Sequence, residues 1–135
     1  MKRTILLALI LACGTAQASE WVSLNKALSG AETAVDVSSI RITGGIRHAW
    51  DKVVYPPQAQ RGVGENSLRW VSYTVSGDVF NCGDGTHRDE ALTTYFTDGT
   101  TASVGPASFP TPWELVAPDS VGGAVMSFVC AWKPK

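Results

Sequence analysis

One possible disulfide constrains the fold of this chain more than any other feature. The sequence contains three cysteines, and Cys13 lies in an apolar N-terminal segment where it should be removed or acylated. Cys82 and Cys130 then remain, and two cysteines allow one intramolecular pairing. Closing a loop of roughly 50 residues stabilises a domain by on the order of 4 kcal/mol in the chain-entropy model. We therefore expect a bond between the centre of the chain and its end; two free thiols or a metal site are the alternatives.

The N-terminus predicts export. Lys2 and Arg3 precede an apolar run over residues 5–12, and the small residues Ala16 and Ala18 form a cleavage site between Ala18 and Ser19. This is the pattern of a secretory signal peptide. The apolar run is shorter than the ~18–20 residues that span a bilayer, so no membrane-spanning helix is expected.

Removal of residues 1–18 would leave residues 19–135 as one domain in the periplasm or at the cell surface. Disulfides form and persist in those compartments. Lipoprotein processing is the alternative, because Ala12 precedes Cys13 and acyl chains on Cys13 would anchor the domain to a membrane. Leu11 fits that processing signal poorly. Both routes take the domain out of the cytosol.

Charge excludes one class of partner. Removing Lys2 and Arg3 from the 11 basic residues leaves 9 against 12 acidic residues, a net charge of −3 for the mature chain. A basic patch with interleaved aromatic residues, as nucleic-acid binding requires, is not present in the sequence. Nucleic acid is therefore not an expected partner.

Most of the chain has the composition of β-strands. Residues 68–82 are rich in aromatic and β-branched residues, and the strand pattern is interrupted at Ser76–Asp78 before it resumes. Glycine pairs and Asp98-Gly99 predict hairpin turns between neighbouring strands. The prolines in residues 105–118 predict an irregular crossover. The expected strands cover residues 21–24, 33–42 with a bend near Ser38, 46–55, 68–82, 88–96 and 101–104.

The C-terminal segment has an ambiguous pattern. Apolar residues in 119–132 recur at helical spacing, with Asp119 or Ser120 as the N-cap, but they also alternate as in a strand. Gly122 and Gly123 disfavour the start of a helix by ~1 kcal/mol each. Periodicity alone leaves helix and strand open.

No motif in the sequence predicts catalysis or a cofactor. A Gly-x-Ser-x-Gly nucleophile elbow is not present. His87 is interpreted as part of a solvated turn that enters a strand, and His48 as a surface or core-edge histidine within a strand. Asp89 and Glu90 should point to opposite faces of a strand. We therefore expect a protein that is not an enzyme and that binds neither a cofactor nor a metal.

Two residues are candidates for binding a protein partner. Most of the five tryptophans should be in the core. Trp113 lies among prolines and is the tryptophan most expected to be exposed, where it could anchor a partner. Arg61 lies in the proline- and glycine-rich stretch 55–66, which is expected to be an exposed recognition loop.

The order of several short motifs resembles the surface-adhesin protein E family of secreted bacterial domains. The similarity covers most of the mature chain and includes Trp21, residues 35–40, Ala49-Trp50, Ser72, Cys82, Tyr95, Gly99, residues 118–122 and residues 128–130. The resemblance implies an α+β fold, an antiparallel sheet of about six strands packed by one C-terminal helix. It also implies that the disulfide ties this helix to the sheet. Gly123 departs from the family pattern and puts the first helical turn in doubt.

The resemblance implies an exported, non-catalytic binding module that acts by protein–protein contact at the cell envelope or surface. Adhesion to host extracellular-matrix proteins is implied only in outline, because no host-binding segment matches residue by residue. The alternative is a soluble periplasmic inhibitor or small-ligand-binding protein. An exposed sheet edge could also support a homodimer.

Overall fold

The fold is α+β, as the resemblance implied. The computed structural model describes residues 18–105 and 112–135. Residues 1–17 of the expected signal peptide, Cys13 among them, and residues 106–111 of the proline-rich crossover lie outside these ranges. The elements are β1 (Trp21–Lys26), β2 (Glu32–Thr43), β3 (Ile46–Val54), the 3₁₀ helix η1 (Gly64–Asn66), β4 (Val71–Asn81), β5 (Thr86–Phe96), β6 (Thr101–Val104), β7 (Glu114–Leu115) and α1 (Val121–Ala131).

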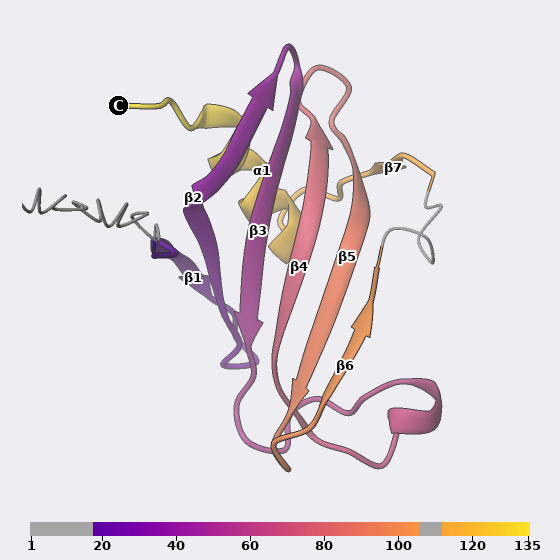
Figure 1. The fold of residues 1–135 in the computed structure, drawn as a ribbon. Helices are drawn as coiled ribbons and strands as arrows, with labels where there is room; N and C mark the ends of the chain where they lie inside the picture. The colour runs from indigo at the N-terminus through magenta and orange to yellow at the C-terminus, as the bar shows by residue number, and fades with distance from the viewer. Residues whose placement is uncertain (1–17, 106–111) are drawn as a thin grey trace, which may run out of the picture.

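The first six strands form an antiparallel sheet in sequence order, from β1 at one edge to β6 at the other. Figure 1 shows α1 packed across one face of this sheet. The pairing of β2 with β3 shifts between Asp36 and Arg41, which confirms the bend expected near Ser38. We call the face that carries α1 the helix face and the other the open face.

Strand β4 is continuous through Ser76–Asp78, as expected for a single strand over residues 68–82. Gly77 lies within β4 and pairs with Trp50 of the neighbouring strand β3. A Cβ at position 77 would lie 3.2 Å from the indole ring of Trp50. The glycine therefore admits a large neighbour instead of breaking the strand. The irregularity falls on β5, where Gly77 pairs with Ala91 and Asp78 pairs with Asp89, leaving Glu90 as the extra residue of a bulge.

Apolar side chains of α1 and the sheet form the core. Val125 and Val129 of α1 are buried with Val35, Ala49 and Phe80 from three different strands. Cys82 and Cys130 form the disulfide, with 5.7 Å between their Cα atoms, and both pack against this core. The expected link from sheet to helix is confirmed.

The C-terminal segment is a helix, and its first turn depends on Gly123. The Ser120 hydroxyl caps the helix by accepting a hydrogen bond from the Gly123 amide at 3.0 Å. A Cβ at position 123 would lie 2.7 Å from the Ala117 carbonyl oxygen. The glycine expected to weaken this turn therefore allows the preceding chain to approach it closely.

Two further expectations were wrong, one on the crossover and one on the tryptophans. Residues 114–115 of the proline-rich crossover form β7, which adds to the edge of β5 instead of remaining irregular. His87 follows the turn at residues 82–85 and lies at the start of β5, as expected for a turn that enters a strand, with its side chain 26% exposed. None of the five tryptophans is fully buried, and only Trp132 packs against the core cluster.

Candidate functional site

The open face carries a groove of about 530 Å³. Strands β2, β3, β4 and β5 supply its walls, so the groove lies across the middle of the sheet. Its lining residues are Ser39, Arg41, Thr43, His48, Ala49, Trp50, Gly77, Asp78, Glu90 and Ala91. Because adjacent residues of a strand point to opposite faces, His48 and Trp50 lie on the open face, while Ala49 faces the core.

Trp50 is the principal apolar residue of the groove. Its side chain lies over Gly77 of β4 and remains 41% exposed. The backbone amide of Trp50 donates a hydrogen bond to the Ser39 hydroxyl at 2.9 Å, which ties β3 to the bend in β2. One side of the indole therefore packs on β4, and the rest of the ring is exposed and accessible to a partner.

Charged groups of both signs border the indole. Glu90 lies 3.5 Å from the Nδ1 atom of His48 and accepts a hydrogen bond from Arg88 at 3.2 Å. Arg41 lies on the β2 side of the groove, where it donates to the Ser38 and Ile40 carbonyls. A rigid aromatic residue surrounded by adaptable charges is typical of protein-contact surfaces.

The two residues expected to bind a partner lie far from each other. Figure 1 shows the segment before β4 at one end of the sheet and β7 towards the other. Trp113 is 41% exposed, which confirms its predicted exposure, and its ring lies 5.0 Å from the Arg88 guanidinium. Arg61 stacks on Trp70 at 3.5 Å and donates to the Leu68 carbonyl at 2.6 Å. Arg61 therefore braces its own loop, and its binding role stays a prediction.

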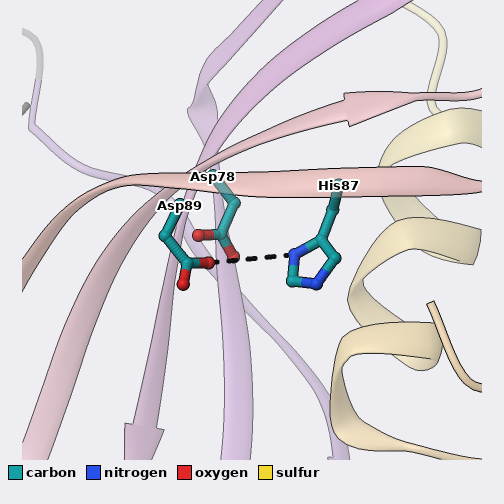
Figure 2. A group of neighbouring side chains, drawn as sticks. All are labelled: Asp78, His87 and Asp89. Atoms are coloured by element: carbon teal, nitrogen blue, oxygen red, sulfur yellow. Dashed lines mark ion pairs between the residues drawn. The ribbon is translucent and has the colours of Figure 1, made fainter. Parts of the chain in front are cut away.

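A second group of polar residues lies on the helix face and was not predicted. Figure 2 shows Asp78 of β4 with His87 and Asp89 of β5, beside α1. Asp78 pairs directly with Asp89, and His87 stacks on Phe80 with ring centroids 6.3 Å apart. Asp51 of β3 adjoins this group and shares a hydrogen bond with Asp78.

The environment of these carboxyl groups opposes their ionisation. Burial, followed by the charge of Asp51 and a hydrogen bond with it, raises the pKa of Asp78 to about 10. Burial also raises the pKa of Asp51, with a further contribution from the charge of Asp89, against a lowering contribution from Asp78. The sequence alone could have indicated that these two carboxyl groups face the core, since Asp51 alternates with Ala49 and Asp78 with Phe80 on buried strands. It could not have indicated the strand register that brings Asp51 and Asp78 together.

Comparisons with known proteins identify the family. The model of the surface-adhesin protein E family matches residues 21–131, which is most of the chain. This chain belongs to the surface-adhesin protein E family. Two solved structures share its fold, both of protein E from Haemophilus influenzae. One has a TM-score of 0.55 at 19% identity, with 90% of this chain and 91% of that chain covered. The other, from a non-typeable strain, has a TM-score of 0.52 at 18% identity, covering 90% and 82%.

No curated protein matches the chain in sequence. Family membership makes this surface-adhesin protein E domain an adhesin-like binding module. No helix in residues 18–105 or 112–135 is long and apolar enough to cross a membrane.

Proposed function

We propose that this domain is exported and binds a protein partner at the cell envelope or surface through the groove beside Trp50, without catalysing a reaction. The observation that carries the proposal is a half-exposed indole held over Gly77 on the open face. Tryptophan is among the residues that contribute most to protein–protein affinity.

The chemistry of the groove favours a protein segment over a compact small ligand. Small-ligand sites usually bury most of the ligand surface, whereas this groove lies on the face of a sheet and includes exposed residues at its border, such as Arg41 and Thr43. Arg41, His48 and Glu90 provide donors and acceptors at several points along it. A partner carrying an apolar side chain flanked by charges would complement this surface.

The family name and the two related structures favour adhesion, and host extracellular-matrix proteins are the partner class we propose. The proposal includes cleavage between Ala18 and Ser19, with soluble export or acylation at Cys13 as the two routes to the envelope. Pairing of two copies through a sheet edge would present two grooves to one partner. The alternative of a periplasmic inhibitor requires the same groove to bind an envelope enzyme.

Direct binding of the exported chain to purified extracellular-matrix proteins tests the proposal. We expect Trp50→Ala to weaken binding at least tenfold. Trp113→Ala is the matched control, because Trp113 is equally exposed at 41% and lies outside the groove. Arg61→Ala tests the loop. Loss of binding in Trp113→Ala or Arg61→Ala, with Trp50→Ala unaffected, would move the contact surface away from the groove. Absence of binding by the wild-type chain would contradict matrix adhesion.

A further inference from the structure

The acidic group on the helix face has the geometry of a cation site. One ligand atom from each of Asp78, His87 and Asp89 lies within 4.8 Å of the others. The Nδ1 atom of His87 lies 3.8 Å from a carboxylate oxygen of Asp89 (Figure 2). A metal ion bonded at about 2.1 Å to nitrogen and oxygen ligands would draw these atoms slightly closer together.

Asp51, beside this group, provides an independent indication of an absent ligand. Its side chain is only 6% exposed, and its Oδ1 atom is buried without a hydrogen-bond partner. The Asp51 carboxyl group shares a hydrogen bond with Asp78, whose own Oδ1 atom is also buried and has no hydrogen-bond partner. Buried polar atoms in native structures are nearly always satisfied, so one such atom on each of two hydrogen-bonded carboxyl groups indicates an absent ligand.

Lysine and arginine side chains of the described residues do not neutralise the carboxyl groups of Asp51 and Asp78. Within residues 18–105 and 112–135, no lysine or arginine lies within 4 Å of a carboxylate oxygen of Asp51 or Asp78. The nearby Arg88 alternates with His87 and Asp89 along β5, and it pairs with Glu90 instead. Adjacent buried carboxylates repel unless a proton or a cation lies between them.

The surroundings also provide access. A cavity of about 30 Å³ opens beside His87 and Asp89; among the described residues, Arg88, Pro112 and Glu114 also line it. This volume is close to the share of liquid occupied by one water molecule. The cavity therefore has room for a single water molecule beside His87 and Asp89.

We propose that Asp78, His87 and Asp89, with Asp51 adjoining Asp78, form a site for one divalent transition-metal cation. Carboxylate oxygens suit Mn²⁺, and the imidazole nitrogen adds affinity for Zn²⁺. Ca²⁺ prefers six to eight oxygen ligands and is disfavoured by this donor set. The site lies on the helix face and shares one residue, Asp78, with the lining of the groove around Trp50; it does not depend on the partner proposed for that groove.

Titration calorimetry on the exported, untagged chain, stripped with a chelator, tests the site with Zn²⁺, Mn²⁺ and Ca²⁺ as separate probes. We expect one equivalent of Zn²⁺ or Mn²⁺ to bind more tightly than Ca²⁺ and to raise the melting temperature. Asp78→Asn and His87→Gln should each weaken binding at least tenfold. His48→Gln is the matched control, because His48 also faces a carboxylate, at 3.5 Å, but only one and on the open face.

Circular dichroism of each metal-free variant establishes that it is folded before titration. No binding by the wild-type chain would overturn the proposal, as would equal affinity in the wild type and a folded Asp78→Asn variant. Tighter binding of Ca²⁺ than of Zn²⁺ and Mn²⁺ would contradict the transition-metal assignment. Binding lost in His48→Gln but retained in His87→Gln would place the cation on the wrong face of the sheet.

Discussion

Removal of the disulfide should destabilise the domain by an amount that its loop length sets. Cys82 and Cys130 are 48 positions apart, and the chain-entropy model gives about 4 kcal/mol for a loop of this size. With a urea m-value of about 2 kcal/mol per M, the unfolding midpoint should fall by about 2 M. The effect arises mainly because the open chain gains freedom when it unfolds.

The assay is equilibrium urea unfolding of the wild-type chain and the Cys82→Ala/Cys130→Ala variant, followed by tryptophan fluorescence. Both sulfur atoms contact the core, so the variant also loses some packing. Reduced wild-type protein retains those atoms and serves as the control that isolates the cross-link. A difference below about 1 kcal/mol between the free energies of unfolding of oxidised and reduced protein would refute the reasoning. The bond would then not restrict the unfolded chain by the amount that the loop length requires.

Three further predictions follow from local geometry and charge. Gly123→Ala should destabilise the domain by about 1–3 kcal/mol in urea unfolding, because the added Cβ would lie 2.7 Å from the Ala117 carbonyl oxygen. Gly122→Ala is the control: a Cβ at position 122 has no neighbour nearer than 3.8 Å, so this change should stabilise the helix by up to about 1 kcal/mol. Equal effects of the two substitutions on the free energy of unfolding would contradict this account. Burial raises the pKa of Asp36, but hydrogen bonds from Ser38 and Glu20 outweigh it and lower the pKa below 3.8. The ionised Asp36 side chain therefore stabilises the fold fully at pH values above its pKa in the unfolded chain, and this stabilisation is lost as the pH falls through its pKa in the folded chain. Asp36→Asn should accordingly have a lower melting temperature than the wild type at pH 7, and the difference should shrink below pH 4. A difference in melting temperature that does not change with pH would refute this. Because the pKa of Asp78 is raised to about 10, its cost to stability grows as the pH rises from 3.8 towards 10. With chelator present, the melting temperature of Asp78→Asn should therefore exceed that of the wild type increasingly from pH 4 to pH 9, and a gap that narrows would contradict the assignment.

Local chemistry in the sequence was enough to predict most of the sheet. Turn residues and β-branched runs placed six strands close to their observed bounds, and the cysteine count predicted the single disulfide. The terminal helix could not be decided from periodicity, because its apolar residues fit both patterns. The resemblance to the family decided it. Strand β7 was missed because two residues carry no periodic signal, and its pairing depends on where β5 ends.

The two candidate sites depended on register, which the sequence does not specify. Trp50 was expected in the core, but its pairing with Gly77 places it on the open face. The acidic group needs Asp78 opposite Asp89 and Asp51 nearby, and a bulge at Glu90 sets that alignment. A shift of one residue would turn each of these side chains to the other face. The expectation for Asp89 and Glu90 was nevertheless sound, since one contacts His87 and the other His48.

Photo-crosslinking on intact bacteria is the most direct test of the groove as the contact surface. A photo-reactive residue is placed at Thr43, on the exposed border of the groove, and separately at Glu65, in η1 within the segment that precedes β4. The account predicts a crosslinked protein partner from position 43 and none from position 65, with the position-43 product lost when Trp50→Ala is added. A crosslink from position 65 alone, or one from position 43 that persists in Trp50→Ala, would contradict it.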